Sequence, residues 1–197
     1  MDHGFNSDER YRIQLPTLTP IKEDNSLKIP YEVTRDSPIA YRKAVEKIGR
    51  YWEREGDFRC GIPYDHECKY ENEKAVFLWT APTTIERFIK NEDGWHDVDI
   101  LNKAIAYGAC GFDYEDKWQL AWIWIHPYER RKGVLTKAWD YFYERFSDEK
   151  GHVDVHYPNE SMLLFLEKDY QKRGVKPPWT KEQIDSYRQD HWLYRKR

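Results

Sequence analysis

The sequence predicts an α/β protein built on one mixed, mostly antiparallel sheet with helices on both faces. Three observations lead to this fold class. Two apolar segments, 104–112 and 118–125, flank the polar turn 114–117 and predict a β-hairpin. A helical repeat of apolar residues follows, and residues 153–156 then predict a strand that pairs in parallel with the second hairpin strand. Amphipathic helices on either side of the hairpin can cover both faces of such a sheet.

The N-terminal half is expected to supply one strand and one helix. Residues 1–28 are polar and contain prolines, so we expect an irregular N-terminal arm there. The run 29–33 predicts the first strand. The segment Asp36–Pro38 places a capping side chain before a proline at the first helical position, which predicts a helix over residues 38–55. Gly56 then ends this helix.

The stretch between this helix and the hairpin predicts a loop, a strand and a short helix. Residues 58–73 carry many charges with Gly and Pro, which is typical of a loop. The apolar run 75–79 predicts a strand. Thr83 or Thr84 can cap a short helix that runs to Ile89.

Two helices are predicted after the hairpin, and a third near the C-terminus. The first carries apolar residues at helical spacing on one face. These residues are Leu135, Ala138, Trp139, Phe142 and Phe146. The second opens at Asn159 or Ser161 and turns Met162, Leu163 and Leu166 inward. A proline pair at 177–178 breaks the chain, and a capping box at the start of 180–192 predicts the last helix.

Length and charge suggest one domain with an appendage at each end. We expect an N-terminal arm over 1–28, a domain over 29–170 and a basic helical extension over 171–197. From Lys168 to Arg197, nine Lys and Arg residues outnumber four Asp and Glu residues. This charge is typical of a solvated terminal helix, and the alternative is a docking surface for an acidic partner or RNA.

The composition argues against several classes of protein. A net charge of −3 and a pI near 6.2 give no whole-chain argument for binding nucleic acid or an anionic membrane. The N-terminus lacks the apolar run of a signal peptide, and no stretch approaches the length of a transmembrane helix. Three cysteines argue against a disulfide framework. We therefore expect a cytoplasmic protein, and an aromatic-rich sheet edge could support a homodimer.

A basic, glycine-containing turn connects the second hairpin strand to the following helix. Backbone N–H groups at a helix N-terminus are unpaired, and the helix dipole adds partial positive charge there. Arg130, Arg131 and Lys132 add formal charge, and Gly133 lets a ligand approach the backbone closely. A pyrophosphate is the natural ligand of such a site. On spacing alone, a plain strand-to-helix connection with surface cations is an equal alternative.

The segment Ile123–Leu135 runs from an apolar strand through a proline into this turn and helix. It resembles the central signature of the GNAT superfamily of N-acetyltransferases, Arg/Gln-x-x-Gly-x-Gly/Ala. Arg130 matches the first position and Gly133 the fourth, whereas Leu135 stands where Gly or Ala is usual. The segment Asn159–Lys168 resembles the family's last strand-to-helix motif. The resemblance covers residues 104–170 and implies a GNAT-like fold.

The resemblance also implies a site for acetyl-CoA as co-substrate. The pyrophosphate would lie on the amides of 131–136, and the backbone of 123–125 would bond the pantetheine arm and the acetyl carbonyl. Asn159 or Ser161 would reach the pantetheine from the neighbouring strand. The implied cofactor-binding residues are Ile123, Trp124, Ile125, Arg130, Arg131, Lys132, Gly133, Val134, Leu135, Thr136, Asn159 and Ser161.

The implied reaction is direct acetyl transfer to a primary amine of a small molecule, peptide or protein. The amide of Ile125 is the candidate donor to the developing oxyanion. Gln119 stands where several family members carry a basic Glu, and Leu166 stands where the Tyr that protonates the thiolate is usual. The remaining candidates are Tyr157 or Ser161 as proton donor and His126 or His156 as base.

Two further sets of residues could form a zinc site or the aromatic wall of a pocket. Cys60, His66 and Cys68, with His96, lack the paired cysteine spacing of structural zinc sites, so no metal is expected. A second set of residues alternates along one strand and is expected to share one core face, or to wall a pocket for a cationic amine. These residues are Trp118, Leu120, Trp122 and Trp124.

Two other functions stay open beside acetyl transfer. Gln119 and Leu166 favour a module without catalytic activity, which would bind acyl-CoA or have a regulatory role. The basic C-terminal extension is the one feature that supports a toxin-like acetyltransferase of aminoacyl-tRNA. The acceptor has no motif, because residues 38–100, which would build its pocket, give only hints of shape.

Overall fold

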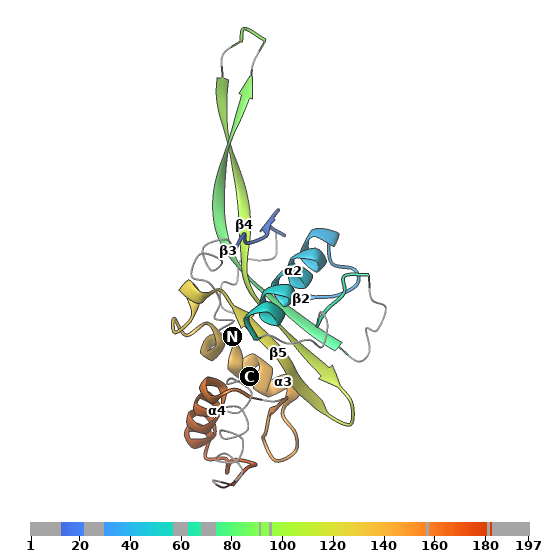
Figure 1. Ribbon diagram of the computed structural model, residues 1–197, viewed down its shortest axis with the longest axis vertical. Helices are drawn as coiled ribbons and strands as arrows, with labels where there is room; N and C mark the ends of the chain where they lie inside the picture. The colour runs from blue at the N-terminus through green and yellow to red at the C-terminus, as the bar shows by residue number, and fades with distance from the viewer. Residues whose placement is uncertain are drawn as a thin grey trace, which may run out of the picture.

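The computed structural model places one sheet at the centre of the protein (Figure 1). It describes residues 13–21, 30–56, 63–67, 74–90, 92–94, 96–156, 158–180 and 182. The helices are α2 (Ile39–Gly56), the 3₁₀ turn η1 (Pro127–Glu129), α3 (Val134–Phe146) and α4 (Glu160–Arg173). The strands are β1 (Thr17–Leu18), β2 (Tyr31–Val33), β3 (Lys74–Lys90), β4 (His96–Tyr114), β5 (Trp118–Ile125) and β6 (Asp154–Val155).

The sheet is mixed and mostly antiparallel, which confirms the predicted fold class. Its strand order is β2-β3-β4-β5-β6, and β1 pairs with β4 beside this path. Neighbours from β2 to β5 are antiparallel, and β5 pairs with β6 in parallel. The predicted hairpin and the predicted strand-helix-strand unit are both present. Part of the segment expected to be an irregular arm also joins the sheet, because Thr17 and Leu18 pair with Ile105 and Ala104.

The two faces of the sheet carry separate cores. One core joins alternate strand residues such as Phe77 and Phe112 to α3 and α4. The other joins their neighbours, such as Leu78 and Ala109, to the buried side of α2. Successive side chains of a strand point to opposite faces, so α2 covers one face while α3 and α4 cover the other. The predicted inward residues Met162, Leu163 and Leu166 are buried as expected.

The short helix predicted over Thr83–Ile89 is wrong, because these residues continue β3. They pair with residues 97–103 of β4, and this part of the β3–β4 pair projects from the domain (Figure 1). Helical spacing does occur in this segment, at Ile85, Phe88 and Ile89. However, β-branched residues favour strands, and residues 97–103 of β4 supply the backbone hydrogen-bond partners of a strand. We call residues 83–90 and 96–103 the projecting hairpin.

The aromatic stripe predicted to share one face of β5 is split by a β-bulge. Trp122 lies opposite Gly111 and Leu120 lies opposite Phe112, so Ala121 has no partner in the register. Trp118 and Leu120 therefore face α3, whereas Trp122 and Trp124 lie in the core under α2. A Cβ on Gly111 would lie 2.2 Å from the indole nitrogen of the tryptophan opposite, so this position needs glycine.

The predicted last helix over 180–192 lies outside the described residues, apart from Thr180 and Glu182. Within the described part of the chain, no helix combines the length and the apolar character needed to cross a membrane.

Candidate functional site

The turn that leads from β5 into α3 presents backbone amides at the start of the helix. Arg131 and Gly133 both have positive φ, 63° and 74°, which turns successive N–H groups toward one side. Gly133 is the N-cap of α3, and no side chain in the described part of the chain caps this helix. Lys137 donates the first helical hydrogen bond, to the carbonyl of Gly133, at 3.0 Å. The N–H groups of 134–136 therefore have no partner within the helix, and they form a site suited to an anion.

The three cations predicted at this turn do not all point at the amides. The guanidinium of Arg130 forms two 2.5 Å hydrogen bonds to Glu55 at the end of α2. Lys132 forms a 2.9 Å ion pair with Glu129. Arg131 is exposed. Two of the three charges are thus paired with carboxylates, and the backbone contributes more of the positive potential than the sequence suggests.

Backbone groups of Ile123 and Ile125 point away from β4. His126 lies opposite Tyr107 and donates its N–H to the Tyr107 carbonyl at 2.8 Å. Hydrogen-bonded and non-hydrogen-bonded pairs alternate in an antiparallel ladder, so Ile125 opposite Gly108 is a non-hydrogen-bonded pair. The N–H and C=O groups of Ile123 and Ile125 consequently face the β6 side of β5.

The β6 side is open along this half of β5. Among the described residues, β6 pairs with β5 only at Gln119 and Leu120, and His156 donates its N–H to the Leu120 carbonyl at 2.9 Å. β6 ends at Val155, and among the described residues no strand pairs with β5 on this side beside Ile123 and Ile125. The outward carbonyl of Ile125 accepts a 2.8 Å hydrogen bond from Nε of Arg130, which leaves its N–H as the group facing the opening.

Glu55 is a site residue that the sequence analysis missed. Its carboxylate accepts hydrogen bonds from Arg130 and, at 2.8 Å, from Nε1 of the buried Trp124. It therefore joins the end of α2 to β5 and to the turn. One sequence signal was present, because an acidic residue in the last turn of a helix opposes the helix dipole unless a cation lies nearby.

His126 is half-buried at the end of β5. Burial lowers its pKa, and the charges of Arg130 and Lys132 lower it further against the opposing effect of Glu129. Nδ1 accepts a 3.4 Å hydrogen bond from the N–H of Tyr128. The neutral ring then carries its proton on Nε2, so this nitrogen is a hydrogen-bond donor.

His156 lies where β5 and β6 separate, and it interacts electrostatically with Asp113. Asp113 lies on β4 directly opposite Gln119. Burial raises the pKa of Asp113, and the charges of Lys74 and His156 lower it in part. The amide of Gln119 thus lies opposite a carboxylate on the next strand, with an imidazole nearby.

The remaining candidates lie at the start of α4 or outside the described residues. Asn159 is the N-cap of α4, and its side chain accepts a 2.9 Å hydrogen bond from the N–H of Met162. Ser161 is exposed in the first turn. Tyr157 lies outside the described residues. Leu166 is fully buried, as is Tyr170, whose hydroxyl donates to the Val153 carbonyl at 3.2 Å.

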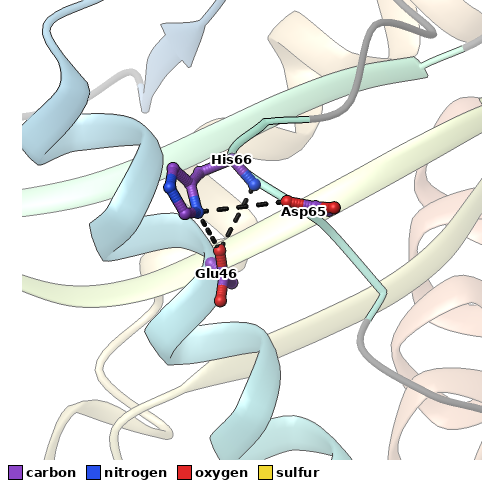
Figure 2. A group of neighbouring side chains, drawn as sticks. All are labelled: Glu46, Asp65 and His66. Atoms are coloured by element: carbon purple, nitrogen blue, oxygen red, sulfur yellow. Dashed lines mark hydrogen bonds and ion pairs between the residues drawn. The ribbon is translucent and has the colours of Figure 1, made fainter.

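A second cluster of titratable side chains joins α2 to residues 65–66, away from this turn. Glu46, Asp65 and His66 lie side by side (Figure 2), and their possible ligand atoms are within 4.8 Å of one another. The Glu46 carboxylate is already bonded to Nδ1 of His66 and, at 2.7 Å, to Arg50. Arg42 donates to the His66 carbonyl at 2.8 Å. Two guanidinium groups at the cluster oppose a bound cation, so the contacts act to hold residues 63–67 against α2.

The predicted zinc alternative shares only His66 with this cluster. Cys60 and Cys68 lie outside the described residues, as does the side chain of His96.

The chain matches the model of a known protein family. The family described as "Acetyltransferase (GNAT) family" matches residues 51–175, which include the end of α2, the turn before α3 and all of α4. No curated protein matches the chain.

Proposed function

Because the chain belongs to the GNAT acetyltransferase family, we propose that it transfers an acetyl group from acetyl-CoA to a primary amine. The observation that carries the proposal is the uncapped N-terminus of α3 beside the open edge of β5. An anion site and a row of outward backbone groups suit the pyrophosphate and the pantetheine amides of one ligand.

In this proposal the pyrophosphate lies on the amides of residues 131–136. Arg131 and Lys132 add charge, and Val134, Leu135 and Thr136 contribute through their backbone. Arg130 acts indirectly, because its side chain holds the carbonyl of Ile125 and the carboxylate of Glu55. The pantetheine runs along Ile123 and Ile125, with Asn159 and Ser161 on the opposite side of the opening.

The acetyl group is moved in one direct step. The acceptor amine attacks the thioester carbonyl, the amide of Ile125 donates to the oxyanion, and the C–S bond breaks as the carbonyl re-forms. We assign the base role to His156, which lies close enough to Asp113 on β4 to interact with it electrostatically. Tyr157, Ser161 and the Nε2–H of His126 are the candidates that return a proton to the thiolate.

A non-catalytic acyl-CoA-binding module is the second candidate function. It is favoured by the burial of Leu166 and by the hydrogen bond that occupies the Tyr170 hydroxyl. A thiol-release assay over a panel of amines separates the two functions. Turnover that falls at least tenfold in His156→Gln supports transfer, and binding with no release from any amine supports the module.

Cofactor binding is tested first, by thermal shift with acetyl-CoA. At about 100 times the Kd, a ligand stabilises the folded state by about 2.7 kcal/mol, which raises Tm by several degrees. Gly133→Asp places a carboxylate at the anion site and should abolish the shift. Gly133→Asn imposes similar backbone strain without the charge and should retain much of it. Gly94→Asp is the matched control, since Gly94 also has positive φ, 84°, and open space around it. No shift with the wild-type protein would overturn the proposal.

A further inference from the structure

The projecting hairpin exposes an unusual amount of apolar side chain. Of the nine large hydrophobic residues that are exposed in the described part of the chain, five lie on it. These residues are Ile85, Phe88, Ile89, Val98 and Ile100. Phe88 and Val98 are directly opposite each other, and they are 67% and 51% exposed. Their pairing makes a continuous apolar row across both strands.

Both edges of the projecting hairpin are also unpaired by any strand of the described residues. β2 pairs with β3 only over Tyr31–Val33, and β1 and β5 pair with β4 only from Ala104 onward. Two-stranded ribbons are marginally stable in water, and long unpaired edges favour pairing with another chain. The projecting hairpin therefore has the geometry of an interface that is completed by a further strand.

The sequence of β3 on this hairpin is complementary to itself. Two copies related by a two-fold axis normal to the sheet pair their β3 strands antiparallel, with side chains of the same face opposite each other. When the axis passes through Phe88, Glu86 of each copy lies opposite Lys90 of the other. The apolar row then extends over four strands, from Val98 and Phe88 to the same two residues of the second copy.

Neighbouring registers lack this complementarity. An axis through Arg87 places Arg87 opposite its own copy, and an axis through Ile89 places Glu86 opposite Glu92. On the other edge, an axis through Val98 places Asp97 opposite Asp99. Like charges directly opposite each other destabilise a strand pair, whereas opposite charges stabilise it.

We propose that the protein forms a homodimer by pairing the β3 strands of two projecting hairpins about Phe88, with Glu86–Lys90 ion pairs on either side. The pairing gives one continuous four-stranded ribbon between two domains. It does not depend on acetyl-CoA, so its failure and the failure of the proposed function are distinguishable.

The charge pairs provide a reversal test by sedimentation velocity on the full chain, at concentrations up to ~100 μM. Glu86→Lys and Lys90→Glu each create two like-charge pairs, and each should weaken the dimer roughly tenfold. The double variant restores opposite charges and should recover most of the wild-type affinity. Glu167→Lys on α4 is the control for a change of net charge and should have no effect. The proposal would be overturned if the wild-type protein stayed monomeric at every concentration. It would also be overturned if the double variant dimerised no more tightly than the single variants.

Crosslinking tests the register itself. In a background with Cys60 and Cys68 replaced by serine, Phe88→Cys places two thiols on the axis, where Cα atoms lie about 4.5–5.5 Å apart and a disulfide can form. Ile100→Cys is the matched control, because it lies on the same face but on the outer strand of the ribbon. Oxidation should link Phe88→Cys into a covalent dimer and leave Ile100→Cys unlinked. Equal linking of both variants, or none at Phe88→Cys, would contradict this register. Circular dichroism on each variant checks that the domain remains folded.

Discussion

Replacement of Glu55 should separate the two kinds of bond that its carboxylate makes. The first is the ion pair with Arg130, in which the Glu55 side chain is 40% exposed and the Arg130 side chain is 39% exposed. A pair this accessible to water is worth no more than about 1 kcal/mol, even with two hydrogen bonds. The second is the bond to Nε1 of Trp124, a residue that is only 3% exposed. Leaving a buried donor without a partner costs about 1–3 kcal/mol.

Glu55→Gln and Glu55→Ala should therefore differ in stability. The amide keeps an oxygen for the Trp124 N–H and loses only the charge, so we expect the free energy of unfolding to fall by about 1 kcal/mol. The alanine variant also leaves the indole N–H of Trp124 without a hydrogen-bond partner, so its free energy of unfolding should fall by about 2–3 kcal/mol.

Urea denaturation followed by far-UV circular dichroism measures both variants, and acetyl-CoA at saturation shows whether the turn still binds. Trp124→Phe in the Glu55→Ala background removes the orphaned donor and serves as the control. Equal losses in Glu55→Gln and Glu55→Ala would refute the role given to the indole. A loss well above 3 kcal/mol in Glu55→Gln would show that exposure does not weaken the ion pair as assumed.

Four further substitutions have outcomes that follow from the structure. Gly111→Ala forces a Cβ against the indole opposite and should destabilise by about 3 kcal/mol in a thermal melt, whereas Gly133→Ala meets open space and should cost about 1 kcal/mol of backbone strain. Burial raises the pKa of Glu46, but hydrogen bonds from Arg50 and His66 outweigh it and lower this pKa from 4.5 to about 2. A carboxyl with a lowered folded-state pKa stabilises the fold above its unfolded pKa, so stability should fall as the pH drops from about 4.5 toward 2. Glu46→Gln should flatten that decline, and an unchanged acid profile would contradict the assignment. Tyr170→Phe should leave the thiol-release rate unchanged while lowering stability by about 1 kcal/mol, because its hydroxyl is bonded to a buried carbonyl; a tenfold loss of rate would instead make Tyr170 a catalytic candidate.

The elements that could be predicted from the sequence are those with local signals. Pro38 and Gly56 mark the ends of α2, and Asn159 caps α4 as one of its two predicted starts. The hairpin of β4 and β5 was predicted because a polar turn separates two apolar runs. The turn before α3 was predicted as an anion site from Gly133 and the following helix, and the structure places left-handed backbone there.

The features that sequence reasoning missed depend on contacts between distant segments. Helical spacing in 83–89 could not reveal that 97–103 would pair with it. Regular alternation along β5 could not reveal Ala121, because a bulge is defined by the partner strand. Glu55 and Trp124 are 69 positions apart, so no local pattern joins them.

The bulge at Ala121 also determines which backbone groups of β5 face the opening toward β6. One extra residue changes which positions of β5 face α3, so Trp122 and Trp124 anchor the strand under α2 while Ile123 and Ile125 lie along the opening toward β6. If β5 alternated regularly through Ala121, every residue type in the strand would be the same, but Trp122 and Trp124 would lie on the same face as Trp118 and Leu120. The tryptophans would then compete with α3 for space, and the opening would present a different set of amides. The set of backbone groups along this edge thus depends on the bulge, and a pattern of residue types along one strand does not show where a bulge lies.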